Sequence, residues 1–280
     1  MCHTVGMKTA VVVGFGRFGA LLGGYLRASY DVKIVEPNPA KAKEAAAQDY
    51  AVITPETIKP YDIIFLCVPI SSLGSTAKEL APYISDGQVV ADVCSVKVYP
   101  IAQLQEQLPH TCIIGTHPMF GPDSAAHGLD GLRLALCPVS APEEAVQEME
   151  LFWSGLGVHV IRTTPEAHDK DAAYSQAFTY TIARMLLAAH APGVTFTTRS
   201  YDKLLDIAEI SRNDSDQLFH DMLAYNPFAP AAITALRQSC NRTFDEIERI
   251  YTNNQYLGAA DELATLTRSR PPHQTTSANI

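Results

Sequence analysis

Short apolar runs alternate with stretches of helical periodicity along the first part of the chain. The apolar runs cover residues 9–13, 32–35, 63–68, 89–93, 111–114, 132–137 and 158–162. The clearest helical stretches between them cover residues 20–28, 38–48, 73–83 and 142–153. A continuous run such as 63–68 is typical of a strand that is covered on both faces. The alternation predicts an α/β fold built on a doubly wound, mainly parallel sheet.

The turn after the first predicted strand is rich in glycine. Its six residues are Gly14, Phe15, Gly16, Arg17, Phe18 and Gly19, and a helical stretch begins directly after them. In this pattern the first glycine permits a tight turn, the second lets a pyrophosphate approach the backbone, and the third lets the helix pack on the strand. The start of the helix also offers free N–H groups to the phosphates. Strand, turn and helix together predict a dinucleotide-binding site formed by these six residues.

Three further residues are assigned to the predicted cofactor site. Glu36 ends the second predicted strand, about 20 residues beyond the glycine turn, where a carboxylate accepts hydrogen bonds from both ribose hydroxyls. The same charge repels a 2′-phosphate, so we expect NAD rather than NADP as the cofactor. Val68 and Pro69 end the apolar run at 63–68 and begin a predicted loop over the cofactor.

His117 begins a stiff segment that follows the apolar run at 111–114. Pro118, Gly121 and Pro122 come directly behind it. Proline fixes φ and lacks a backbone donor, so the chain is not expected to continue here as strand or helix. Open α/β sheets place reacting groups at the carboxyl ends of their strands, and histidine has the side-chain pKa nearest to neutral pH. His117 is therefore a candidate for proton transfer, although a histidine that only caps a turn has the same pattern.

Ser95 and Lys97 follow another predicted strand, the one at 89–93. One interpretation makes them a helix cap and a solvated charge. The other places a hydroxyl and an ammonium beside the nicotinamide, with Lys97 as a candidate substrate-binding residue. The spacing alone favours neither interpretation.

Beyond residue 163 no stretch up to about residue 255 has a strand pattern, and helices are predicted at 167–189, 202–210, 216–225 and 231–251. The long first helix opens with His168. Gln176, Tyr180 and Arg184 follow on one face of it, at spacings of four residues. Polar groups in an otherwise apolar helix indicate a substrate-facing surface, or else a helix-end histidine and a surface arginine.

The change of pattern predicts three parts. Residues 1–163 form a dinucleotide-binding domain of Rossmann type, residues 164–267 an all-helical substrate and dimerisation domain, and residues 268–280 a disordered tail. The helical part has apolar stretches such as 182–189 and little room for a core of its own. We therefore expect a homodimer that is joined through residues 164–260.

Composition excludes several classes of function. The net charge is −9 over 280 residues without a basic run, which argues against nucleic acid as a partner. No apolar stretch approaches the ~20 residues of a membrane span, and the first eight residues lack a signal-peptide pattern. The six cysteines are scattered, and no spacing of His, Cys and carboxylates indicates a metal site. We expect a cytoplasmic protein with reduced thiols and no metal.

These segments together resemble the prephenate/arogenate dehydrogenase family of tyrosine biosynthesis. The segments that match, in family order, are the glycine turn at 14–19, Ser95-Val96-Lys97, His117-Pro118-Met119-Phe120-Gly121 and His168-Asp169. The resemblance implies a Rossmann domain and a helical domain that pairs two subunits. It also implies that His117 is the catalytic base, that Ser95 is its neighbour on the substrate hydroxyl, and that His168 is a substrate-binding residue.

The implied reaction is the NAD-dependent oxidative decarboxylation of prephenate to 4-hydroxyphenylpyruvate, or of arogenate to tyrosine. The substrate is a cyclohexadiene with a ring carboxylate at C1 and a hydroxyl at C4. Hydride leaves C4 for the nicotinamide, and a neutral histidine accepts the hydroxyl proton. Loss of carbon dioxide then gives an aromatic phenol, which drives the step.

One residue of the family pattern is displaced. Family members usually carry an arginine for a substrate carboxylate in the helix after the long one, and a gapless reading puts Glu209 or Ile210 there. A guanidinium binds a carboxylate with two parallel hydrogen bonds, so another arginine must replace it in an active enzyme. Arg184 is the first candidate, because it shares a helix face with Gln176, and Arg212 is the second.

Two other functions remain alternatives. A dehydrogenase of the β-hydroxyacid type uses a lysine early in its second domain, and Lys170 lies near that place, but the segment from His117 onwards would then be unexplained. An NAD-binding regulatory protein without turnover would explain the displaced arginine. Turnover of prephenate or arogenate with NAD separates both from the dehydrogenase.

Overall fold

The computed structural model describes residues 7–189, 194 and 196–253. The chain divides into two compact units, Met1–Ala232 and Ile233–Ile280. The first unit holds the sheet with its helices and the helical region that follows it. The described part of the second unit belongs to a single helix. The tail predicted at 268–280 lies outside the described residues.

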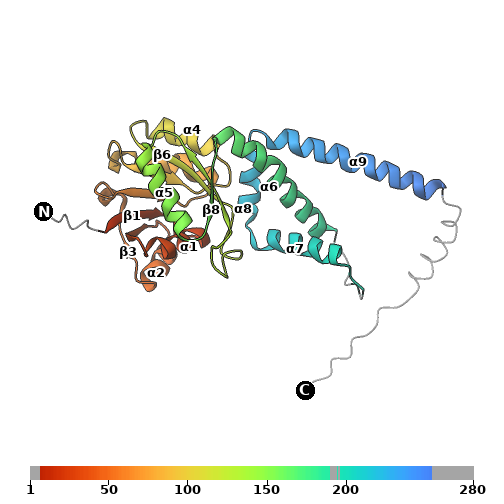
Figure 1. Cartoon of the computed structure of the whole chain (residues 1–280), viewed down its shortest axis with the longest axis horizontal. Helices are drawn as coiled ribbons and strands as arrows, with labels where there is room; N and C mark the ends of the chain where they lie inside the picture. Colours follow the sequence, from red (N-terminus) through yellow and green to blue (C-terminus); the bar gives the residue numbers. More distant parts are fainter. Residues whose placement is uncertain (1–6, 190–193, 195, 254–280) are drawn as a thin grey trace, which may run out of the picture. The chain divides into compact units, whose positions relative to one another are not determined.

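One mixed sheet organises the first unit (Figure 1). Its strands are β1 (Lys8–Val13), β2 (Tyr30–Val35), β3 (Ala51–Val52), β4 (Ile63–Leu66), β5 (Val89–Asp92), β6 (Cys112–Pro118), β7 (Arg133–Pro138) and β8 (His159–Arg162). They lie in the order β3-β2-β1-β4-β5-β6-β7-β8. All neighbours are parallel except β6 and β7. The predicted doubly wound, mainly parallel α/β sheet is confirmed.

Helices connect the strands and make up the described chain beyond β8. They are α1 (Arg17–Leu26), α2 (Pro39–Ala47), α3 (Ile70–Leu80), α4 (Val98–Gln107), α5 (Glu143–Gly155), α6 (Pro165–Ala188), α7 (Arg199–Asn213), α8 (Asp216–Ala224) and α9 (Ala229–Asn253). Short 3₁₀ turns cover Pro55–Thr57 and Ala81–Tyr83. The start of α6 is fixed by its local sequence. The Thr164 side chain accepts the Ala167 N–H, and Pro165 occupies the first turn of the helix.

Two hydrophobic layers cover the two faces of the sheet. On one face α1, α2 and α5 bury residues such as Leu22, Ala45 and Trp153 against β1, β2 and β4. On the other face α3 and α4 bury Leu73 and Leu104 against the same central strands. Every residue of β4 is buried, as its unbroken apolar run predicts.

The helical region of the first unit packs against α3 and α4, the helices that cover the second face of the sheet. α6 contacts α4, α7 and α8, and α8 also contacts α3. None of the helices in the described residues combines the length and the apolarity that a membrane crossing needs. No strand lies between Pro165 and Asn253 among the described residues, in agreement with the sequence pattern.

Three local predictions are corrected by the structure. The strand expected to end at residue 114 continues through His117 to Pro118. The loop expected at 69–71 is already helix from Ile70. The short strand β3 at the sheet edge has no counterpart in the predicted elements, because two residues are too few to give a periodic pattern.

The strand β6 continues because its neighbour β7 tolerates the proline. His117 pairs with Ala135, and Pro118 lies opposite Leu134 in this antiparallel ladder. The Met119 N–H donates to the Arg133 carbonyl at 2.9 Å, so the proline nitrogen falls on the side away from β7. The missing donor of Pro118 therefore removes no ladder hydrogen bond.

The five described cysteines are free of disulfides. Cys94 and Cys137 are buried, and burial raises the pKa of the Cys137 thiol to about 12. The sixth, Cys2, lies outside the described residues.

Candidate functional site

The glycine turn lies where the strand order reverses, between the carboxyl ends of β1 and β4. Gly14 has a φ of 97°, and a Cβ on it would lie 2.4 Å from the carbonyl oxygen of Cys67. A Cβ on Gly19 would lie 2.0 Å from the Gly14 carbonyl oxygen and push α1 off the turn. A Cβ on Gly16 would meet no side chain closer than Lys41 Nζ, at 3.9 Å, so a ligand could approach the backbone here. The three positions meet the three requirements of the sequence pattern.

The start of α1 can receive an anion. Gly16 is its N-cap residue and has no side chain that could cap the helix. Glu36, directly after β2, fixes a negative charge beside the same turn. Its carboxylate accepts the Phe15 N–H at 2.6 Å and the Asn38 N–H at 2.8 Å. A helix start without a side-chain cap and a nearby carboxylate are the features that fit a pyrophosphate and a ribose.

The aromatic side chains of the turn belong to the core. Phe15 is buried, and its ring centroid lies 5.4 Å from that of Tyr50. The Phe18 ring centroid lies 6.3 Å from that of Phe120. The Phe15 ring is therefore not accessible to a ligand, and the Phe18 ring packs against the core.

Arg17 ties the glycine turn to the segment that follows β6. Its guanidinium donates to both carboxylate oxygens of Asp123, at 2.7 and 2.8 Å, and both side chains are about half exposed. Val68 and Pro69 lie between β4 and α3, with Val68 half-buried and Pro69 exposed. All the predicted cofactor residues are thus grouped around the carboxyl ends of β1, β2 and β4.

A buried ion pair supports the far end of β6. β5 ends opposite Gly115, so the last residues of β6 lack a strand on that side. Lys97 Nζ takes the place of that strand, since it binds the Asp92 carboxylate and donates to the Thr116 carbonyl at 2.7 Å. Neither Lys97 nor Asp92 has any exposed side-chain surface. The interpretation of Lys97 as a solvated charge is wrong, and any effect of its ammonium on a ligand passes through these buried partners.

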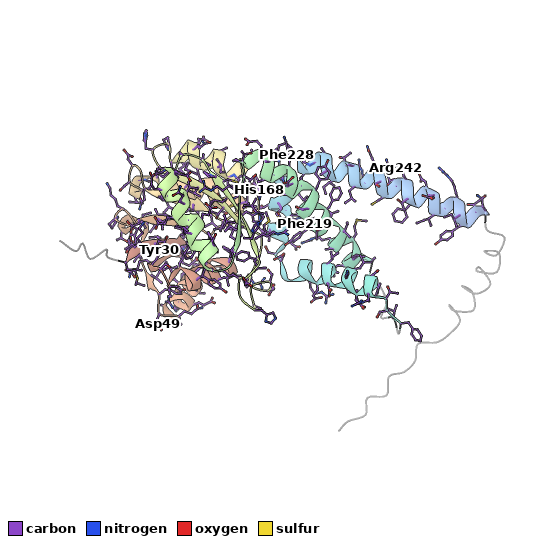
Figure 2. All side chains as sticks on the ribbon, in the orientation of Figure 1. Tyr30, Asp49, His168, Phe219, Phe228 and Arg242 are labelled. Carbon is purple, nitrogen blue, oxygen red and sulfur yellow. The ribbon has the colours of Figure 1, made fainter. Side chains whose placement is uncertain are left out.

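His117 faces α6 from the end of β6. Its Nδ1 lies 2.8 Å from His168 Nε2, and its Nε2 lies 3.2 Å from the side-chain nitrogen of Gln176. His168 Nδ1 lies 2.8 Å from Asp169 Oδ1. Figure 2 shows His168 at the start of α6, beside the sheet. The helix thus places two polar groups, His168 and Gln176, against one buried imidazole, with Asp169 behind His168.

Asp169 joins the helical region to the sheet. Its carboxylate accepts the Lys97 N–H at 2.7 Å and the Val98 N–H at 2.9 Å, which caps the start of α4. Its own carbonyl accepts a hydrogen bond from the Asn226 side chain at 2.9 Å. We call Asp92, Lys97, His117, His168 and Asp169 the buried network.

The position of His168 departs from the substrate-binding role expected of it. Both of its ring nitrogens are engaged by His117 and Asp169, so it lies behind His117 and not beside it. Ser95 is half-buried in the turn between β5 and α4, and its hydroxyl has no hydrogen bond to a described residue in this structure. The structure thus brings His117, His168 and Gln176 into contact, with Ser95 in the adjoining turn.

Burial determines the charge state of His117. Desolvation lowers the pKa of this imidazole well below its ordinary value, and a positive charge on His168 or Lys97 opposes its protonation further. At neutral pH the ring is therefore neutral and keeps one nitrogen lone pair. A neutral imidazole at the carboxyl edge of a sheet is suited to accept a proton.

The two candidate arginines are both paired. Arg184 donates to Asp216 at 2.5 Å, and its guanidinium lies 4.2 Å from the ring centroid of Phe219, while its buried Nε has no hydrogen-bond partner among the described residues. Arg212 is largely exposed and lies 3.4 Å from Glu209, one turn earlier on α7. Arg184 thus faces its neighbours in the helical region, and Arg212 is not turned inward.

Two residues of this site were missed by sequence reasoning. Asp92 lies inside the apolar run predicted at 89–93, and Asn226 falls between two predicted helices. Only the pairing of distant segments reveals their roles. The described residues hold no group of three or more His, Cys, Asp or Glu side chains that is arranged to bind a metal ion.

Comparison with known proteins gives two matches to family models. The model described as the prephenate dehydrogenase nucleotide-binding domain matches residues 22–162, half of the chain. The model described as the TYRAAT1-like C-terminal domain matches residues 185–254. The first match covers β2 to β8 and includes His117.

Whole-chain relatives extend the match. Arogenate dehydrogenase 2, chloroplastic, of Arabidopsis thaliana is 30% identical over 78% of this chain and 64% of its own length. The T-protein of Haemophilus influenzae is 29% identical over 91% of this chain and 64% of its own length. The chain therefore spans just under two thirds of each of these relatives.

A solved structure shows the same fold. The prephenate dehydrogenase of Aquifex aeolicus, in complex with hydroxyphenyl propionate and NAD+, has a TM-score of 0.70 and 19% identity, and the match covers 95% of this chain and 99% of that one. The resemblance that the sequence segments suggest is confirmed. The chain belongs to the prephenate/arogenate dehydrogenase family.

Proposed function

We propose that this chain is an NAD-dependent dehydrogenase that oxidatively decarboxylates prephenate or arogenate. The observation that carries the proposal is His117, a buried and neutral imidazole at the carboxyl end of β6. Its Nε2 is bound only by the Gln176 amide among the described residues, and an amide is readily displaced by a substrate hydroxyl. The relatives with these activities support the same substrate class.

The cofactor site fits a dinucleotide. The start of α1 and the sterically open backbone at Gly16 would hold the pyrophosphate, and Glu36 would accept the ribose hydroxyls. NAD, when bound, supplies the acceptor for the hydride that leaves ring carbon C4. Because Glu36 is negative, a 2′-phosphate would be repelled, and NAD is preferred over NADP.

The residues of this chain handle the proton and the orientation of the substrate. His117 Nε2 accepts the proton of the C4 hydroxyl, and Ser95, in the neighbouring turn, orients that hydroxyl. Arg184 is the proposed partner of a substrate carboxylate, in exchange for Asp216. Gln176 and Arg184 are eight residues apart on α6, so about 12 Å of helix separates their backbones. Their side chains shorten this distance for a substrate that places its hydroxyl at His117 and a carboxylate at Arg184.

The alternative of a β-hydroxyacid-type dehydrogenase is less well supported by the geometry. Lys170 is exposed, and its Nζ lies 5.4 Å from the ring centroid of Phe228. His168, two residues earlier on the same helix, faces His117 instead. The helix thus turns its histidine, and not its lysine, toward the end of β6.

Turnover is the direct test. The full chain is mixed with NAD and either prephenate or arogenate, and the absorbance of the reduced cofactor is followed over time. We expect turnover with at least one substrate, and lower efficiency when NADP replaces NAD. Binding of NAD without turnover of either substrate would contradict the proposal and support a regulatory role. Equal efficiency with NADP would contradict the role of Glu36.

The proposed assembly is a homodimer formed through the helical region. In the first unit, α6 and α7 expose the apolar side chains Tyr174, Met185, Leu204 and Leu205. In the second unit, α9 exposes Phe244, Ile250 and Tyr251. Exposed apolar side chains in such number favour burial against another chain. Light scattering at micromolar concentration is expected to give twice the mass of the chain, and a monomer would contradict the proposal.

A further inference from the structure

In the buried network, the donor and the acceptor of each hydrogen bond can be assigned by starting from Asp169. Asp169 Oδ1 accepts the Lys97 N–H, and Asp169 Oδ2 accepts the Val98 N–H. Backbone N–H groups only donate, so this ionised carboxylate acts as an acceptor on both oxygens. The third contact of the carboxylate, to His168 Nδ1 at 2.8 Å, must then be a hydrogen bond that the histidine donates.

This direction fixes the tautomer of both histidines. A neutral His168 with its proton on Nδ1 has a lone pair on Nε2, which accepts a hydrogen bond from His117 Nδ1. A neutral His117 with its proton on Nδ1 presents its own lone pair on Nε2. The Gln176 amide nitrogen, 3.2 Å away, donates to that lone pair. Each donor in the series then meets one acceptor.

We propose that His168 and Asp169 are positioning residues, which together hold His117 with its lone pair on Nε2, and that His168 accepts the Nδ1 proton of His117 when Nε2 becomes protonated. The proposal deepens the proposed function and rests on it. A role for Asp169 limited to capping α4 would need only its two backbone contacts. The third contact is what links the cap to the base.

The proton transfers of this series balance. The substrate O–H bond breaks, and its proton forms an N–H bond at His117 Nε2. The Nδ1–H bond of His117 breaks, and that proton moves to His168 Nε2. His168 then carries a proton on each nitrogen and one positive charge, which faces the carboxylate of Asp169. The proton stays in the protein, and no oxidant or further reactant takes part.

The second transfer has an electrostatic reason. His117 has almost no access to water, and the Lys97 ammonium nearby opposes a positive charge on its ring. His168 is also buried, but it is in direct contact with a carboxylate. Moving the charge by one ring places it beside its counter-ion, where the Coulomb energy is lower.

The tautomers can be measured without turnover. The full chain is labelled with ¹⁵N-histidine, and the nitrogen chemical shifts are recorded at neutral pH without ligands. Spectra of His117→Asn and His168→Gln assign the two rings. We expect both rings to carry the proton on Nδ1 and a lone pair on Nε2. A wild-type His117 with its proton on Nε2 would overturn the proposal.

A variant then removes the acceptor at the end of the series. In Asp169→Ala the group that accepts the His168 Nδ1–H is lost, so nothing holds the proton of either ring on Nδ1. We expect both rings to become mixtures of the two tautomers and kcat to fall by at least about tenfold. Asp171→Ala, the same change at an exposed position of α6, is the matched control. Unchanged tautomers in folded Asp169→Ala, or a kcat equal to that of the control, would overturn the proposal.

His168→Gln serves if Asp169→Ala does not fold. Its amide oxygen can accept the His117 Nδ1–H but cannot take up a proton. We expect His117 to keep its tautomer and kcat to fall by at least about tenfold, whereas an unchanged kcat would overturn the transfer to His168. A wild-type chain with the expected tautomers but no turnover would support the hydrogen-bond assignment and contradict the proposed function, so the two failures are distinguishable.

Discussion

The buried network and the exposed arginine pairs use the same residue types in opposite ways. Lys97 and Asp92 have no exposed side-chain surface, and each of their contacts is inside the protein. Arg184 is partly exposed and its partner Asp216 is 81% exposed. Breaking the buried pair leaves a charge without solvent, whereas water can replace either partner of the exposed pair. The first kind of pair fixes geometry, and the second can exchange its partner for a ligand.

The largest expected effect is on the base of the buried network. His117→Asn keeps a polar side chain but removes the ring nitrogen that accepts the proton. We expect kcat to fall by ~10²–10⁴-fold while NAD affinity stays unchanged. Steady-state kinetics and titration with NAD measure the two quantities separately. A variant with near-normal kcat would exclude His117 as the base.

The pH dependence of the wild-type chain sharpens the same point. The pKa of His117 is lowered by burial, so the ring is in its active, neutral form at neutral pH. Activity is lost as pH falls through this lowered pKa, which lies below the ordinary histidine value of about 6.5. The profile of kcat/KM against pH measures it. An acidic limb at or above the ordinary histidine pKa would contradict the buried, neutral assignment.

Removing the buried cation is expected to act on stability. Lys97→Met leaves the Asp92 carboxylate unpaired in the interior, which costs about 3–5 kcal/mol of unfolding free energy. Urea unfolding measures the loss. Lys43→Met, at an exposed position of α2, is the matched control and is expected to change little. If both variants unfold at the same urea concentration, Lys97 is not a buried structural charge.

A smaller effect is expected at the exposed pair on α6. Arg184→Ala removes a charge-assisted contact worth ~1.5–3 kcal/mol, so KM for the substrate should rise at least about tenfold. NAD affinity and the unfolding midpoint are expected to stay close to those of the wild-type chain. An unchanged KM would show that Arg184 only pairs with Asp216.

The smallest effect is expected at Arg212. Its side chain is 63% exposed and pairs only weakly with Glu209 at 3.4 Å. Arg212→Ala should leave KM unchanged and shift the unfolding free energy by less than about 0.5 kcal/mol. A rise in KM for this variant, with none for Arg184→Ala, would reverse the order of the two candidates.

The contrast also explains what the sequence can predict. The glycine turn and the Thr164 cap each lie in one short segment, so a local pattern is enough to identify them. The contact between Lys97 and Asp169 joins residues 72 positions apart, and that between His117 and His168 joins residues 51 apart. Their residue types were recognisable as candidates, but their partners were not.

The extension of β6 beyond residue 114 is a case of the same kind. The local pattern, with a proline directly after His117, favours an end to the strand. The structure continues it because β7 pairs with it on one side and Lys97 fills the other. Tertiary contacts thus override a local signal. The roles of Lys97 and Asp92 depend on their contact with each other and with β6, which neither segment predicts by itself.

The two backbone amides that Asp169 binds report on the separation of α6 from α4. The amide hydrogens of Lys97 and Val98 are held by a carboxylate on another element, since Asp169 belongs to α6. They can exchange with solvent deuterium only when α6 moves away from the start of α4. Their exchange rate therefore measures how often the helical region separates from the sheet near His117. Any ligand that bridges the two would slow exchange at these two amides first.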